Sequence, residues 1–169
     1  MKTLLLALLF VSYAATAIAA TRSEMEAARA AAQVAQDKAN EKKMAALSQF
    51  DETDSFRELC STAREVSSDA TLGDALFSIG EENRTLGQSS HATGCGKLAD
   101  AEKKYAEAEA LRAQSYFTAA TAKYAAAVVA FDSVSFTDFQ AALNYWRTAS
   151  DNYLSALFWY YLGPPPMPE

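Results

Sequence analysis

The hydrophobic positions of this chain recur with the 3.6-residue period of an α-helix almost everywhere beyond residue 20. The strict alternation of apolar and polar residues that marks a half-buried strand is absent from the same region. Alanine is the commonest residue, and it favours helices and lets helix backbones approach closely. The pattern predicts an all-α protein, folded as a helical bundle.

The period and the capping signals together predict five helical segments. Their approximate bounds are residues 23–50, 55–67, 71–86, 97–131 and 135–162. Ser23 is the expected N-cap of the first segment. Ser55 with Glu58, and Ser135 with Asp138, have the spacing of a capping box, in which each side chain bonds the other residue's backbone N–H. We therefore expect new helices to begin at Ser55 and Ser135.

The last two segments are joined by only a few residues, which predicts a long antiparallel αα-hairpin as the centre of the bundle. The shorter helices would pack on it, and residues 55–163 would form the core of the domain. Residues 21–54 are rich in alanine and poor in large apolar side chains. We expect this first helix to protrude, to fray or to pack against a partner. Residues 164–169 are rich in proline and form an extended tail.

Three pairs of a leucine or isoleucine with a glycine recur seven residues apart, at residues 72–73, 79–80 and 86–87. Glycine costs about 1 kcal/mol in a helix relative to alanine, so the glycines indicate either a close helix–helix contact or a marginal helix that breaks. Asn83 is a candidate glycosylation acceptor in an Asn-Arg-Thr sequon, yet it falls within the apolar stripe of this segment. We expect the helix to end near Leu86 and the sequon to stay unused.

Residues 87–96 are polar and rich in glycine, which predicts a loop. The loop would contain the single histidine, His91, and Cys95. The other cysteine is Cys60, and an even number of cysteines in an exported chain favours a disulfide between them. The competing interpretation is two free thiols, with Cys60 packed as a small apolar residue in a helix core.

The first twenty residues have the features of a cleaved signal peptide. Lys2 precedes the apolar run of residues 4–11, and Ala17-Ile18-Ala19 offers the small residues that signal peptidase accepts. We expect a secreted protein, periplasmic if the host is a bacterium. Removing Lys2 from the 15 basic residues leaves 14 against 21 acidic residues, a net charge of −7. Such a chain has no electrostatic reason to bind nucleic acid or an anionic membrane surface.

The residues that catalysis requires are sparse. His91 is expected to be a solvated loop residue, and no nucleophile elbow surrounds Ser89 and Ser90. The chain has no H-x3-H, no C-x-x-C, no calcium loop and no phosphate-binding glycine loop. We therefore expect no catalytic residues, no metal site and no cofactor, and we expect that the protein is not an enzyme.

Four consecutive aromatic residues, Phe158 to Tyr161, point in all directions around one helix. Part of this cluster can enter the core, and the rest has to be covered by another segment or to contact a partner. The candidate interaction surface consists of Trp146, Tyr153, Phe158, Trp159, Tyr160 and Tyr161. The expected function is that of a helical interaction or structural protein that binds a protein partner or itself. The alternative is a carrier of an apolar small molecule or lipid, in which the bundle opens around the ligand.

Overall fold

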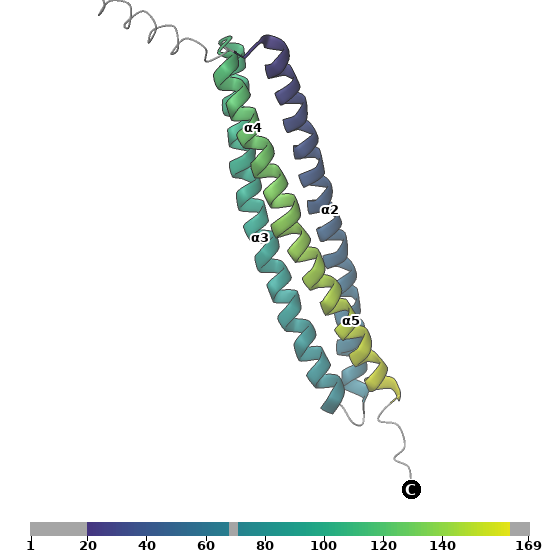
Figure 1. Ribbon diagram of the computed structural model, residues 1–169. Helices are drawn as coiled ribbons and strands as arrows, with labels where there is room; N and C mark the ends of the chain where they lie inside the picture. Colours follow the sequence, from purple (N-terminus) through teal and green to yellow (C-terminus); the bar gives the residue numbers. More distant parts are fainter. Residues whose placement is uncertain (1–19, 68–70, 163–169) are drawn as a thin grey trace, which may run out of the picture.

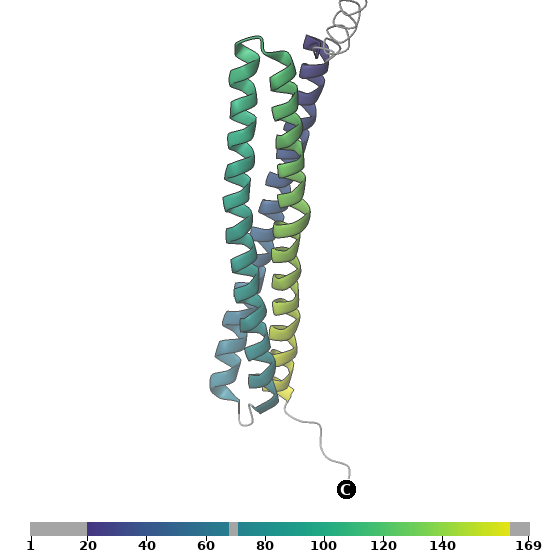
Figure 2. The ribbon, with the colours of Figure 1, turned by 60° about the vertical axis from the view of Figure 1, so that its left-hand side comes forward.

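The computed structural model describes residues 20–67 and 71–162. These residues form three long helical rods that lie side by side (Figures 1 and 2). The rods are α2 (Arg22–Val66), α3 (Thr71–Ala113), and a continuous third rod of α4 (Phe117–Ser133), the π-helix η1 (Val134–Phe139) and α5 (Gln140–Leu162). The described residues contain no strand. The predicted all-α bundle containing a long antiparallel hairpin is confirmed, but the hairpin forms between α3 and the third rod. The hairpin expected between residues 97–131 and 135–162 does not form, because residues 117–162 lie in one continuous rod.

The third rod lies close to both other helices, whereas α2 and α3 are farther from each other. The buried positions repeat every seven residues, as in a coiled coil. In α2 the buried residues with this spacing are Met25, Ala32, Ala39, Ala46, Thr53 and Cys60. Most are small, so the third rod can approach α2 closely along the whole of its length. The N-terminal half of α2 is therefore packed and does not protrude.

The predicted break between residues 50 and 55 does not occur, and α2 begins earlier than expected. Thr21, not Ser23, is the N-cap: its side chain accepts a hydrogen bond from the Glu24 N–H, and Glu24 completes the capping box. The Ser55 hydroxyl donates to the Asp51 carbonyl inside the helix, so Ser55 caps nothing. The helix continues through this local capping signal because packing that repeats every seven residues buries more apolar surface than a new helix start would.

The predicted loop at residues 87–96 is also wrong, since α3 runs through it. The hairpin turn lies instead at residues 114–116, within the predicted helix 97–131. Ser115 has a φ of 61°, its N–H donates to the Arg112 carbonyl, and the Tyr116 N–H donates to the Leu111 carbonyl. This is a Schellman motif, in which the left-handed position is usually a glycine. Without glycine or proline there, the sequence offered no signal for the turn.

The predicted helix end near residue 131 does not occur, and Ser135 is not an N-cap. The chain passes through the π-helix η1, in which Ser135 is fully buried. Its hydroxyl has no hydrogen-bond partner among the described residues. Buried aromatic residues are seven apart on either side of η1, but Phe131 and Phe139 are eight apart. The π-helix absorbs the extra residue and keeps both sets of rings on the same face of the rod.

Some predictions lie outside the described residues. They concern residues 1–19 of the signal peptide and the proline-rich tail at residues 164–169. Among the helices that the structure does describe, none is both long enough and apolar enough to cross a membrane.

Candidate functional site

The contact between α3 and α5 consists of glycines that face aromatic rings. Gly73, Gly80, Gly87 and Gly94 are buried, and a Cβ atom on each would clash with an aromatic ring of the third rod. The rings belong, in the same order, to Tyr160, Tyr153, Trp146 and Phe139. Each step of seven residues along α3 is matched by a step of seven backwards along the third rod, because the helices are antiparallel. Of the two interpretations of the glycines, close helix–helix contact is the one observed.

This packing corrects half of the predicted interaction surface. Trp146 and Tyr153 are at most 2% exposed, and Tyr160 is 5% exposed. These three side chains belong to the core because they point at the glycines of α3. They cannot contact a partner while the bundle is folded. Phe158 and Tyr161 are exposed, and Trp159 is half-buried with its ring edge-on to Phe158.

The buried tyrosines end in polar groups that join all three rods. The Tyr160 hydroxyl donates to Asp74 Oδ1 of α3 at 2.8 Å, and Arg64 of α2 lies 2.7 Å from the same oxygen. The hydrogen bond from Tyr160 and the adjacent Arg64 lower the pKa of Asp74 despite some burial. The three side chains thus form one layer of tyrosine, carboxylate and arginine across the bundle.

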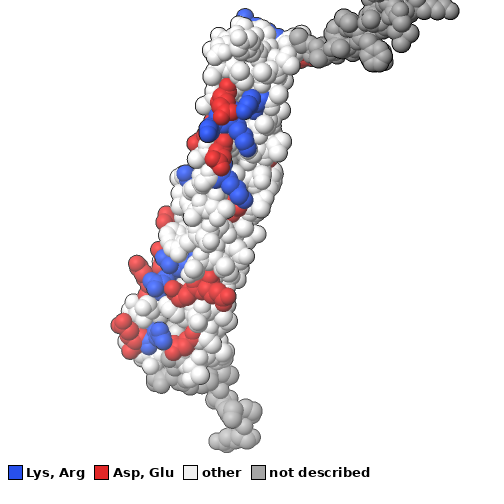
Figure 3. Space-filling model, turned by 90° about the vertical axis from the view of Figure 1, so that its left-hand side faces the viewer, with Lys and Arg blue, Asp and Glu red and all other residues white. Residues whose placement is uncertain are grey.

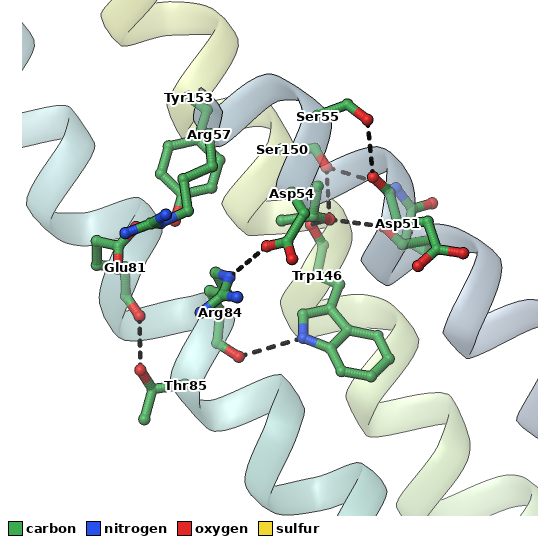
Figure 4. Close-up of polar contacts among 12 residues, drawn as sticks. Asp51, Asp54, Ser55, Arg57, Glu81, Arg84, Thr85, Trp146, Ser150 and Tyr153 are labelled. Carbon is green, nitrogen blue, oxygen red and sulfur yellow. Dashed lines mark hydrogen bonds and ion pairs between the residues drawn. The ribbon is translucent and has the colours of Figure 1, made fainter. Parts of the chain in front are cut away.

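A second layer lies seven residues farther along each helix. The Tyr153 hydroxyl donates to Glu81 Oε1 at 2.7 Å, and Arg57 pairs with the same oxygen. Figure 4 shows Tyr153 and Arg57 converging on Glu81 from α5 and α2. Burial and the hydrogen bond to Glu81 raise the pKa of the Tyr153 phenol. The carboxylate follows a buried glycine in both layers, which is why it lies beside the hydroxyl of the tyrosine.

A third layer repeats the arrangement at the other end of the bundle. Tyr124 donates to Glu109 Oε1 at 2.7 Å, and Arg29 of α2 pairs with that oxygen. Arg112 lies 2.9 Å from the second oxygen, Glu109 Oε2. Burial raises the pKa of Glu109, but the hydrogen bonds from Arg29, Tyr124 and Arg112 outweigh it and lower the pKa to about 2. Each tyrosine hydroxyl, each carboxylate and each of these arginines has at least one partner within its own layer, so the layers link the three rods to one another.

Two further contacts tie α5 to its neighbours near the centre. The Trp146 indole N–H donates to the Arg84 carbonyl at 3.1 Å, and Arg84 pairs with Asp54 of α2 (Figure 4). The buried Thr53 hydroxyl lies 2.9 Å from the Ser150 hydroxyl. These bonds fix which edge of α5 faces α2 and which faces α3.

One apolar area stays uncovered around the C-terminal turns of α5. We call it the α5 outer face, and it consists of Leu154, Phe158, Tyr161 and Leu162 of α5 with Leu59 and Val66 of α2. The exposed fractions of these six residues run from 42% for Leu154 to 76% for Val66. Leu154 lies one turn beyond Ser150, on the edge of α5 that faces α2. Leu59 and Val66 lie on the edge of α2 opposite to Arg57 and Arg64, which face α3.

A smaller apolar stripe follows the outer edge of α3. Leu72, Ile79 and Leu86 are 41–49% exposed and lie seven residues apart, on the side of α3 away from α2. Asn83 lies among them, half-buried, and its amide donates to the Ile79 carbonyl at 2.9 Å. Helix α3 does not end at Leu86, so the sequon lies within a helix. That glycosylation does not occur at Asn83 stays a prediction.

The predicted disulfide is absent, and both cysteines are free. Cys60 is fully buried in a core cluster with Tyr153 and Tyr160, whereas Cys95 packs against a different cluster toward the other end of the bundle. Burial raises the pKa of the Cys60 thiol to about 11. The structure therefore agrees with the competing interpretation, in which the two thiols are free and Cys60 packs as a small apolar residue in the core.

His91 is not a solvated loop residue. Its ring lies in α3, 5.6 Å from the ring centroids of both Phe139 and Trp146. Burial, and then the charge of Lys43, lower the pKa of the imidazole. Cys95 Sγ lies 3.8 Å from His91 Nδ1, a distance that follows from their four-residue separation on one helix. We find no group among the described residues that orients this pair for catalysis.

The described residues contain no cluster of three or more histidine, cysteine, aspartate or glutamate side chains that could hold a metal ion. On the face seen in Figure 3, acidic and basic side chains lie intermixed in groups along the bundle. This face therefore shows no extended surface of a single charge.

Comparisons with protein-family models, with curated proteins and with solved structures gave no match for this chain.

Proposed function

We propose that this protein is an exported, non-catalytic helical protein that binds a protein partner through the α5 outer face. The observation that carries the proposal is the distribution of the C-terminal aromatic residues. Tyr153 and Tyr160 fill the core, while Phe158 and Tyr161 on the same helix remain exposed. A contiguous exposed apolar patch on a soluble domain typically marks a site of interaction.

The close packing of the bundle supports this role. A packed core holds the exposed side chains of α5 in place through the glycine contacts and the tyrosine–carboxylate–arginine layers. A rigid apolar face loses little conformational entropy when a partner binds. The carrier hypothesis has less support, because the interior of the described residues is filled by large buried side chains such as Trp146, Phe131 and Phe139.

Export is part of the proposal and rests on the predicted signal peptide. The intact mass of the secreted protein tests it directly. Loss of the first 19 or 20 residues supports export by a cleaved signal, and a secreted species that retains them contradicts it.

A photo-crosslinking experiment tests the interaction. A benzophenone amino acid replaces Phe158 in the purified protein, and the matched control carries it at Val129, which is 70% exposed on α4. Both proteins are irradiated in extracellular fluid of the source organism. We expect a crosslinked protein adduct from position 158 and none from position 129. No adduct from position 158, or equal adducts from both, overturns the proposal.

A further inference from the structure

The C-terminal half of α5 is apolar on two opposite faces. Tyr153, Ala156 and Tyr160 point into the core and are buried. Leu154, Phe158 and Leu162 lie on the other side of the same turns and are exposed. No charged residue occurs between residues 152 and 162. A helix that is apolar all round is ordinarily buried all round, and no segment among residues 20–67 and 71–162 covers the outer side of α5.

We propose that a second copy of this chain covers the α5 outer face, an inference that rests on the proposed function and names the partner. The two copies form a two-fold symmetric dimer in which their α5 helices cross antiparallel near Phe158. The exposed large apolar residues of α5, which are Leu154, Phe158, Tyr161 and Leu162, follow the spacing i, i+4, i+7, i+8, which is the stripe that packs one helix against another.

The symmetry follows from the position of the stripe. Phe158 lies midway between Leu154 and Leu162, so a two-fold axis through Phe158 places Leu154 of one copy opposite Leu162 of the other. A two-fold interface uses the same surface on both subunits and needs a surface that complements itself. An apolar stripe without charges meets this condition, because no buried charge is left without a partner.

The area of the face is large enough for a dimer. Six large side chains with a mean exposure near 60% present about 600 Å² per copy, if each offers roughly 150–200 Å² when fully exposed. A stable interface buries about 800 Å² per partner, of which more than half is apolar and the rest is a polar rim. Residues bordering the face, including the exposed Arg147 and Asp151, are available for that rim.

The charge of the chain argues against a lipid surface as the cover. The mature chain carries an expected net charge of −7, which an anionic membrane surface repels. A second copy needs no such attraction, since the contact is apolar. A different protein, or the tail of the same chain, is an outcome that the experiment below separates from a dimer.

The mass of the purified protein in solution, measured by sedimentation over a range of concentrations, tests the dimer. We expect a dimer whose association weakens at least about tenfold in Phe158→Glu, because the charge would be buried at the centre of the contact. Val129→Glu is the matched control, since it places the same charge about 43 Å away along the rod and leaves association unchanged. Leu154→Ser replaces Phe158→Glu if the melting curve of the latter shows a loss of fold.

Cysteine crosslinking tests the position of the axis. In a Cys95→Ser background, Phe158→Cys lies near its own counterpart and forms a disulfide-linked dimer under mild oxidation. Val129→Cys stays monomeric in the same background. A chain that stays monomeric at about 1 mM, or a dimer that tolerates Phe158→Glu and crosslinks equally at position 129, overturns the inference. An adduct with a different protein from position 158, together with a monomeric chain, overturns the dimer alone and leaves the proposed function standing.

Discussion

The ring of Tyr153 lies directly on Gly80, so closely that a Cβ atom added to Gly80 would fall 2.6 Å from Cε1 of that ring. Any side chain at this position would have to displace a fully buried tyrosine. Three other glycines of α3 face aromatic rings of the third rod in the same way. The approach of α3 to α5 therefore depends on the absence of side chains at a position that repeats every seven residues.

Replacing this glycine tests the contact. Gly80→Ala removes a helix-destabilising glycine, but the new methyl group meets the Tyr153 ring, and we expect a net loss of about 1–3 kcal/mol in the free energy of unfolding. Gly96→Ala is the matched control on the same helix, where a Cβ atom would meet nothing within 4 Å. It should stabilise the protein by about 0.5–1 kcal/mol. Urea unfolding measures both, and a Gly80→Ala protein as stable as the wild type would refute the close contact.

The tyrosine layers make a second prediction. Tyr153→Phe keeps the ring on Gly80 but removes the hydroxyl that donates to Glu81. We expect a loss of about 1–2 kcal/mol, because the carboxylate loses a partly buried partner. Tyr161→Phe, at an exposed position of the same helix, should change stability by less than about 0.5 kcal/mol. Equal effects in the two variants would contradict the structural role of the layer.

Acid should weaken the bundle through Glu109. Its folded-state pKa of about 2 lies below the ordinary value of 4.5, so its contribution to stability is present above pH 4.5 and is lost as the pH falls toward 2. We expect the unfolding free energy of Glu109→Gln to depend less on pH than that of the wild type over the range from about pH 5 to pH 2. The reason is that the wild-type carboxylate takes up its proton within this range, whereas glutamine has no proton to take up. Glu102→Gln, at an exposed position of the same helix, is the matched control for the loss of a carboxylate. The outcome that counts against the prediction is a Glu109→Gln curve parallel to the wild type.

The π-helix predicts an unusual tolerance to deletion. Removing the exposed Thr137 takes out the extra residue, so that a continuous α-helix would place Phe131 and Phe139 seven positions apart like the other rings. We expect this deletion to preserve helix content and to cost at most about 2 kcal/mol. Deleting the exposed Thr148 instead rotates Tyr153 and Tyr160 by about 100° away from α3. It should cost more than about 4 kcal/mol, as buried aromatic contacts are lost. Circular dichroism with urea unfolding distinguishes the two, and equal damage would disprove this account of η1.

The two cysteines should differ in reactivity. Burial raises the pKa of Cys60 to about 11, so this thiol should resist alkylation at pH 8 while the half-buried Cys95 reacts. We expect one alkylated cysteine per native chain and two after unfolding in urea, as counted by intact mass. Cys95→Ser should abolish the native reaction. A mass that changes on reduction alone would show the disulfide that the structure lacks.

The places where sequence reasoning failed share one cause. Ser55 and Ser135 carry strong local capping signals, yet both lie inside helices because neighbouring rods bury the residues around them. Ser115 occupies a left-handed position without being a glycine, so the true turn had no local signal. One available clue was missed: aromatic residues repeat every seven positions from Phe139 to Tyr160, in step with the glycines of α3. That match indicates which helices pack together.

The amino-acid sequence by itself determined that this protein is helical and where its apolar stripes run, because helix period and propensity are properties of neighbouring residues. It also marked the region of residues 158–161 as exceptionally aromatic. Only the tertiary structure decided that the described residues form three rods instead of five helices, and that the glycines of α3 pack against aromatic rings of the third rod. It also decided that Phe158 and Tyr161 stay exposed while Tyr153 and Tyr160 are buried. The reason is that burial depends on which faces of distant segments meet, and that choice minimises the free energy of the whole bundle.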